Sequence, residues 1–143
     1  MALQYQRGLA RRAVNRLVHV LLRLGLGPRE TYLLTVAGRR SGAPRSTPVT
    51  LVEEGGWRWL VSPYGEVAWV RNLRAAGRAT LSRGRRTEAI AVRESSAEEA
   101  APVLKWYVTR VPITRPYFDV RPESDLSAFR AEAPRHPVFA IVG

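Results

Sequence analysis

Apolar residues at the start of the chain recur with the spacing of an α-helix. Across residues 5–24 they return every three or four positions, as Ala10, Ala13, Val14, Leu17, Val18, Leu21 and Leu24. Arginines and His19 fill the opposite face, and glycines with Pro28 follow at the end. The pattern predicts a basic amphipathic helix. It either caps the domain, with its arginines in water, or lies on an anionic membrane surface.

Beyond Pro28 the pattern changes to short apolar and β-branched runs separated by turn residues. These runs predict strands at residues 31–37, 46–52, 57–62, 79–82, 87–92 and 138–142. Helical spacing predicts a helix at 66–76, a second from Ser95 or Ser96 to about Val108, and a helical turn at 125–130. Glu98 or Glu99 completes a capping box at the start of the second helix.

Strands joined by hairpins, with one helix inserted between them, argue against a parallel sheet. We therefore expect an α+β, mainly β, fold: a small antiparallel barrel with helices packed outside it. The chain is expected to divide into the N-terminal helix at 1–27 and a cofactor-binding barrel domain at 28–143.

The residue composition excludes several kinds of chemistry. The 143 residues include no cysteine and only two histidines, so disulfides, thiolate catalysis and Cys-ligated metals are ruled out, and no metal site is expected. No apolar run approaches the roughly 20 residues of a membrane span. The net charge of +11 comes almost wholly from arginine. It points to nucleic acid, an anionic membrane surface or a polyanionic small molecule as the partner.

The stretch LTVAGRRSGAPRSTPV, residues 34–49, gathers three arginines around one turn. Like charges repel, so crowding Arg39, Arg40 and Arg45 is favourable only when something negative lies outside the chain. Gly38 and Gly42 can take positive φ, which lets successive backbone N–H groups converge on an anion. Hydroxyls add further donors, at Ser41, Ser46 and Thr47. The stretch predicts a phosphate-sized anion site, with a solvated hairpin turn as the alternative.

The stretch SPYGEVAWVRNL, residues 62–73, leads from a predicted strand into a predicted helix. Its loop contains Pro63 and Gly65, so unpaired N–H groups point outward at the start of the helix. Trp69 and Asn72 lie three residues apart and share one face. This predicts a flat apolar surface beside a polar amide, or else a core tryptophan with an asparagine that satisfies nearby backbone.

Together the two stretches resemble the deazaflavin-dependent nitroreductase and quinone reductase family. The resemblance covers about residues 32–93 and rests on Thr-x-x-Gly-Arg-Arg-Ser-Gly, then Pro48, then Trp-x-x-Asn-Leu, in that order. It implies a split β-barrel related to the pyridoxamine-phosphate-oxidase type of flavoprotein. It also implies coenzyme F420, a deazaflavin with a flat ring, a phosphodiester and a tail of glutamates, with FMN as the second candidate.

The resemblance implies roles for individual residues. The arginine turn would grip the phosphate and tail through Arg39, Arg40, Ser41, Gly42 and Arg45. The ring would lie against Thr47, Pro48 and Val49, bordered by Ser62, Tyr64 and Gly65 and buttressed by Trp69 and Asn72. The loop Ser-Pro-Tyr-Gly departs from the Ser-Lys-Gly-Gly pattern of many relatives.

A third stretch, WYVTRVPITRPYFDV at residues 106–120, places aromatic residues next to arginines. By the same resemblance, Tyr107 and Tyr117 are the candidate catalytic residues on the substrate side of the ring. A tyrosine hydroxyl there could supply the proton that complements hydride addition. Ordinary core and dimer packing is the alternative.

We therefore expect an F420H2-dependent oxidoreductase that transfers a hydride to a quinone, a nitroaromatic or an activated enone. The alternatives are a non-catalytic split-barrel protein that binds F420, FMN or lipid, and a barrel that binds single-stranded nucleic acid. No nucleic acid is expected, because the arginines are spread along the chain. We expect a cytoplasmic protein with a polyanionic cofactor and a small hydrophobic acceptor. Pairing as a homodimer and contact with the inner face of the membrane through residues 5–24 stay open.

Overall fold

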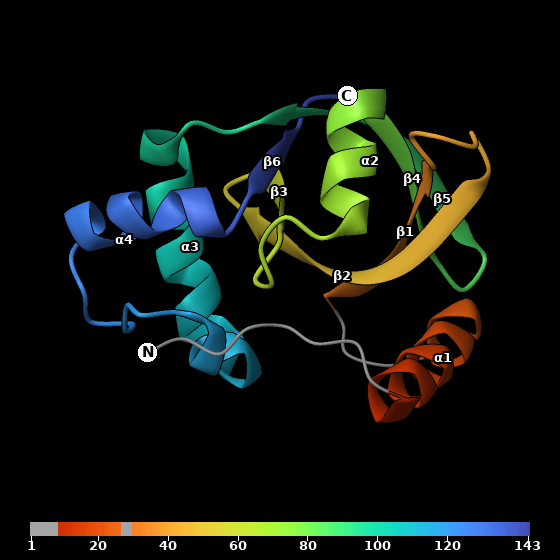
Figure 1. Cartoon of the computed structure of the whole chain (residues 1–143), viewed down its shortest axis with the longest axis horizontal. Coiled ribbons are helices and arrows are strands. Elements are labelled where there is room, and N and C mark those ends of the chain that lie inside the picture. The colour runs from red at the N-terminus through yellow and green to blue at the C-terminus, as the bar shows by residue number, and fades with distance from the viewer. Residues whose placement is uncertain (1–8, 27–29) are drawn as a thin grey trace.

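The computed structural model describes residues 9–26 and 30–143. Six strands form a closed antiparallel barrel in the order β1-β2-β3-β6-β5-β4 (Figure 1). They are β1 (Thr31–Ala37), β2 (Pro44–Glu54), β3 (Trp57–Val61), β4 (Arg78–Arg83), β5 (Arg86–Glu94) and β6 (Val138–Ile141). The predicted fold class is confirmed, and each predicted strand is present.

Strand β2 is longer than the sequence pattern predicted. It begins at Pro44 and ends at Glu54 because its first half pairs with β1 as far as Ala37 opposite Pro44. Its second half pairs with β3, as far as Glu54 opposite Trp57. The exposed residues at both ends carry no apolar alternation, so cross-strand hydrogen bonding alone extends the strand.

Helices cover the barrel from several sides. They are α1 (Leu9–Arg23), α2 (Ala68–Ala76), α3 (Ala97–Arg110) and α4 (Leu126–Glu132), with 3-10 turns η1 (Pro112–Tyr117) and η2 (Ala133–Arg135). The predicted chain break at Pro112 and Pro116 is η1, because prolines lack the N–H that would continue α3. Figure 1 shows α3 beside α4 on one flank, and α1 lies against β1, β2 and β4.

Two apolar clusters hold these layers together. Inside the barrel, α2 inserts Val70 and Leu73 among strand residues such as Leu34, Leu60 and Phe139. A second cluster joins α3 and α4 to the outside of β3. The first cluster fixes α2 against β1, which positions the loop before α2 next to the β1–β2 turn.

Helix α1 lies on the barrel with its arginines exposed, but few of its apolar residues are covered. Among residues 12–26 only Leu22 is fully buried, whereas Val14, Leu17 and Leu24 are 54%, 59% and 67% exposed. Residues 5–8 of the predicted helix and the predicted stop at Gly27 and Pro28 lie outside the described residues. Contact of this helix with a membrane stays a prediction, as does the division of the chain at residue 27. Within the described ranges, no helix has the length and apolar content needed to cross a bilayer.

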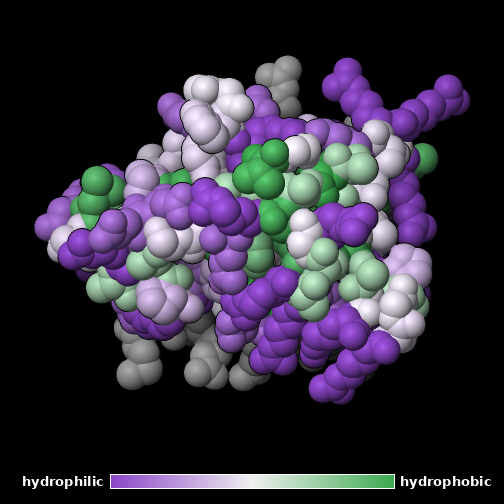
Figure 2. All heavy atoms as spheres, turned by 90° about the horizontal axis from the view of Figure 1, so that it is seen from above, coloured by the Kyte–Doolittle hydropathy of each residue, from purple (hydrophilic) through white to green (hydrophobic). Residues whose placement is uncertain are grey.

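The surface carries many cationic side chains. Figure 2, viewed from above the orientation of Figure 1, shows a group of apolar side chains enclosed by hydrophilic ones, several of which extend far from the body of the molecule. Several arginines outside the cavity described below form ion pairs with carboxylates, as in Arg58 with Glu88 and Arg93 with Glu99. The Arg93 guanidinium and the Ser96 N–H lower the pKa of Glu99 to about 2.

The capping box of α3 supplies a test of this local structure. The Ser96 hydroxyl accepts a hydrogen bond from the Glu99 N–H at 3.2 Å, and the Glu99 carboxylate accepts one from the Ser96 N–H at 3.0 Å. Ser96→Ala removes the cap and should lower the free energy of unfolding by about 1 kcal/mol in urea denaturation. Ser127→Ala, an exposed change in α4, should alter it by less than about 0.5 kcal/mol. Equal effects for the two variants would contradict a capping role.

Candidate functional site

A large cavity opens between the barrel and the helices around it. Its volume is about 1310 Å³, and its walls come from α1, the β1–β2 turn, β2, the β3–α2 loop, the start of α2 and the end of α3 with η1. These segments are distant in sequence, and the barrel brings them to one place. The cavity contains both stretches that the sequence singled out.

The β1–β2 turn forms the first wall. Its backbone is folded tightly on itself: the Gly38 N–H donates to the Ala43 carbonyl at 2.8 Å, and the Gly42 N–H donates to the Gly38 carbonyl at 2.8 Å. The Ala43 N–H donates to the Ser41 hydroxyl at 3.2 Å. The predicted convergence of backbone N–H groups on an anion is therefore wrong for most of the turn, because these donors already have partners.

The two glycines of the turn serve different purposes. Gly42 adopts a positive φ of 72°, as predicted. Gly38 does not, but a Cβ on it would lie 3.1 Å from the Ser41 hydroxyl and 3.3 Å from the Ala43 carbonyl oxygen. Gly38 thus permits the close packing of the turn. Most of the anion donors that remain are therefore side chains.

Asn72 joins the turn to α2. This buried side chain on α2 accepts two hydrogen bonds through Oδ1, from the Arg39 N–H at 3.1 Å and from the Arg39 guanidinium at 2.9 Å. One amide oxygen therefore fixes both the backbone and the side chain of Arg39. The sequence placed Asn72 beside the ring pocket, or as an asparagine that satisfies nearby backbone; in the structure it bonds the backbone and the side chain of the arginine turn.

The arginines of the cavity have no carboxylate partner in the part of the chain that the structure describes. Seven guanidiniums line it, those of Arg12, Arg16, Arg23, Arg39, Arg40, Arg45 and Arg71. Across 9–26 and 30–143, none of them forms an ion pair. The lining contains one acidic residue, Glu66, and its carboxylate is paired with Arg74 at 2.7 Å. Such a concentration of uncompensated charge in a concave site attracts an anion of several charges.

The cavity continues from the turn into a less polar region. Thr47, Pro48 and Val49 line it from β2, and Tyr64 and Trp69 line it from the β3–α2 loop and the start of α2. The β2 residues that line the cavity run from Pro44, at the turn, to Thr50. A strand rises about 3.3 Å per residue, so these two residues are about 20 Å apart. The site therefore suits an extended ligand with a charged end and a flat apolar end.

Residues 9–121 match the family described as F420H(2)-dependent quinone reductase. The chain belongs to this family. The resemblance seen in the sequence is thereby confirmed, and the match extends well beyond residues 32–93 on both sides.

Solved structures agree with this membership in the F420H2-dependent quinone reductase family. One is an F420-H2 dependent reductase, FDR-A, with 26% identity and a TM-score of 0.57, covering 80% of this chain and 95% of that one. A domain-swapped dimer matches at 23% identity and a TM-score of 0.58, covering 93% and 96%. A candidate pyridoxamine 5′-phosphate oxidase from Listeria innocua matches at 14% and 0.52, covering 90% and 92%. The last two show a shared fold alone. A comparison with curated proteins gives no match.

The far end of the cavity in this family member contains Tyr107. Its side chain is 2% exposed, and its hydroxyl hydrogen-bonds the side chains of Thr50 and Thr114. Burial raises the pKa of the Tyr107 hydroxyl, because the charged phenolate is disfavoured away from water. Tyr117, the second predicted substrate-side residue, is not part of the lining. It packs edge-on against Tyr64, with ring centroids 4.8 Å apart.

Some predicted binding residues support the wall without lining it. Ser62 is buried, and its hydroxyl donates to the Gly65 carbonyl at 2.6 Å, which closes the β3–α2 loop. Gly65 has a positive φ of 87° and also lies behind the wall. Helix α2 then begins after Val67 with no side-chain cap, so its open first turn lies at the cavity, where Ala68 and Trp69 line it.

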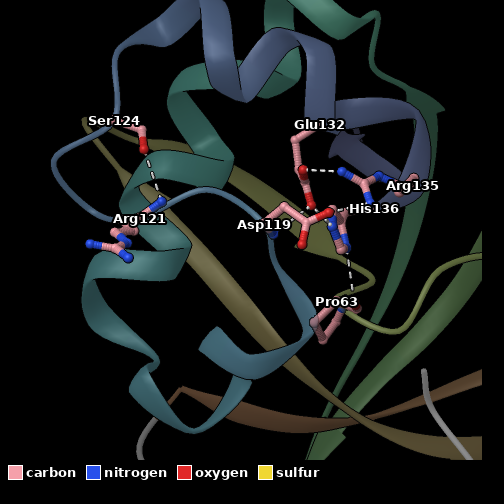
Figure 3. A network of polar contacts seen from close by, with 7 residues as sticks. All are labelled: Pro63, Asp119, Arg121, Ser124, Glu132, Arg135 and His136. Carbon is pink, nitrogen blue, oxygen red and sulfur yellow. Dashed lines mark hydrogen bonds and ion pairs between the residues drawn. The ribbon is translucent and has the colours of Figure 1, made fainter. Parts of the chain in front are cut away.

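A buried polar network fixes the same loop from behind. Figure 3 shows His136 between Glu132 and Pro63: its Nε2 lies 2.8 Å from the Glu132 carboxylate and its Nδ1 lies 2.9 Å from the Pro63 carbonyl oxygen. Burial lowers the pKa of His136, and its two acceptors oppose this. Arg135 bonds both Glu132 and Asp119, and Phe118 stacks on the His136 ring. His136 therefore holds the Pro63 backbone in place at the cavity wall.

Sequence reasoning missed the contribution of α1 and of Arg71 to the cavity. Arg12, Arg16, His19 and Arg23 are spaced at i, i+4, i+7 and i+11, which places them on one helix face. That regular spacing was the available signal. It is read more readily as a solvated polar face than as the wall of a site.

The Asn72 side chain gives a specific test of the turn. Asn72→Ala leaves the part-buried Arg39 N–H and the Arg39 guanidinium without their acceptor and should lower the free energy of unfolding by about 1 kcal/mol. Asn72→Asp keeps the acceptor and should preserve most of the stability, but its carboxylate neutralises Arg39 and should weaken anion binding. Urea denaturation and phosphate titration would measure the two effects. If both variants lose the same stability, the hydrogen bonds to Arg39 do not hold the turn.

Proposed function

We propose that the protein binds reduced coenzyme F420 and transfers a hydride to a small electron-poor acceptor such as a quinone, a nitroaromatic or an activated enone. One observation carries this proposal: a cavity unites an apolar, aromatic wall with seven arginines that form no ion pair with any residue the structure describes. Membership in the F420H2-dependent quinone reductase family supports the choice of cofactor and of a quinone acceptor.

The residues that would hold the cofactor fall into two groups. Arg39, Arg40 and Arg45, with the Ser41 hydroxyl, suit the phosphodiester and the glutamate tail, because guanidinium groups make bidentate, charge-assisted bonds to both. Pro48 and Val49 of β2, with the side chains of Tyr64 and Trp69, would hold the flat ring, because all four line the less polar part of the cavity. FMN, with one phosphate, would leave much of the positive charge uncompensated.

The chemistry divides between cofactor and protein. When bound, the reduced deazaflavin supplies the hydride. The protein positions ring and acceptor side by side and excludes water from the buried end of the cavity. The Tyr107 hydroxyl, kept protonated by burial and oriented by Thr50 and Thr114, is the candidate proton donor to the reduced acceptor.

Fluorescence titration with F420, followed by turnover of reduced F420 with menadione, tests the proposal. Saturable binding with turnover supports the enzyme. Binding without turnover of any quinone or nitroaromatic indicates a non-catalytic carrier. Tighter binding of FMN, or binding of a labelled oligonucleotide at moderate salt without F420 binding, overturns the proposal.

Arg45→Ala should weaken F420 binding by about tenfold or more, because it removes a charge-assisted contact to the anion. Its free energy of unfolding should change by less than about 0.5 kcal/mol, since the side chain is exposed and without an ion pair. Arg130→Ala, an equally exposed change in α4, is the matched control and should leave affinity unchanged. Equal affinity of the Arg45 variant and wild type would exclude the turn as the anion site.

Tyr107→Phe tests the proton donor. Loss of the hydroxyl should lower kcat for menadione by about 100-fold while KM and F420 affinity stay close to wild type. Tyr32→Phe, a tyrosine of β1 that does not line the cavity, is the control. If the Tyr107 variant retains its kcat, solvent or another group provides the proton.

A further inference from the structure

Helix α1 presents a row of cations to the cavity. Arg12, Arg16, His19 and Arg23 lie on one face and all line it. At about 1.5 Å per residue, the row extends over about 16 Å. A single phosphate spans only a small part of that length, whereas an extended chain of carboxylates matches it.

Helix α1 follows the ordinary pattern of a surface helix only in part. Such a helix turns its apolar stripe to the core and its charges to water. Here Leu22 is buried but Val14 and Leu17 are exposed, and the exposed arginines line a cavity that also contains the cations of the β1–β2 turn. Facing two sets of like charges across one cavity is unfavourable unless an anion lies between them.

Backbone contacts, not charges, hold α1 in this position. Leu22 is fully buried, and its carbonyl accepts a hydrogen bond from the Gly84 N–H in the β4–β5 turn at 2.8 Å. The backbone after α1 and the β4–β5 turn approach so closely that a Cβ on Gly84 would lie 3.1 Å from the Cα of Gly25. Changing the arginines of α1 should therefore leave the helix where it is.

We infer that α1 is a second cationic wall of the cavity and that its contacts make the affinity for the cofactor depend on the length of the anionic tail. This rests on the proposed function and extends it. The three arginines of the turn suffice for the phosphodiester and the nearest carboxylate, and Arg16 and Arg23 bind the carboxylates added by further glutamates. Affinity then depends on the number of glutamates, and α1 sets that dependence.

Titration of the full chain with F420 that carries no glutamate, a short tail or a long tail tests this inference. In wild type, Kd should fall by about 2- to 5-fold for each added glutamate, the range for an exposed ion pair. The double variant Arg16→Ala and Arg23→Ala should bind the tail-less form as wild type does but gain little from added glutamates. Arg16→Lys with Arg23→Lys should restore part of the gain, because the charge returns without the bidentate geometry.

A control of equal charge is Arg78→Ala with Arg130→Ala, two exposed arginines that do not line the cavity. It should keep the wild-type dependence on tail length, and circular dichroism should show all variants folded. The inference is overturned if the α1 double variant keeps that dependence, or if wild type binds every form equally. Failure of wild type to bind even the tail-less form would instead overturn the proposed function.

Discussion

The site depends on one buried amide oxygen. Oδ1 of Asn72 accepts both hydrogen bonds that Arg39 directs toward α2, and so it sets the distance between the β1–β2 turn and the helix. Without this link, the mutual repulsion of Arg39, Arg40 and Arg45 would favour an open turn. With it, a hairpin of the barrel and a helix inserted between β3 and β4 become two walls of one cavity. The apolar contacts of Val70 and Leu73 keep Asn72 in place.

Positive charge is divided unevenly over the molecule. Arginines on the outer surface, such as Arg58, Arg74 and Arg93, have carboxylates at hydrogen-bond distance. Those around the cavity do not, within the part of the chain that the structure describes. Most of the carboxylates thus lie away from the site, and the seven arginines of the cavity leave an excess of positive charge where a ligand can reach it.

Local patterns predicted most of the fold, because strands and hairpins follow from alternation and turn residues that lie close in sequence. The capping box at Ser96 and Glu99 is one such case. The site was predictable only in part. The family resemblance singled out Arg39 and Asn72 but did not pair them, and the positions of Tyr107 and Tyr117 depend on how α3 and η1 pack. The direction of the α1 arginines depends on a contact with the β4–β5 turn, which no local pattern encodes.

The meeting of Gly25 and Gly84 extends control of the site to a place with no chemistry of its own. Both residues have positive φ, so a side chain on either would strain its own backbone. A Cβ on Gly84 would also press against the backbone of Gly25. A side chain at Gly84 would push the end of α1 away from the β4–β5 turn and so change the direction of the guanidiniums on α1. Substitutions in the remote β4–β5 turn can thus change the affinity for a ligand during evolution, while each residue that contacts the ligand stays the same.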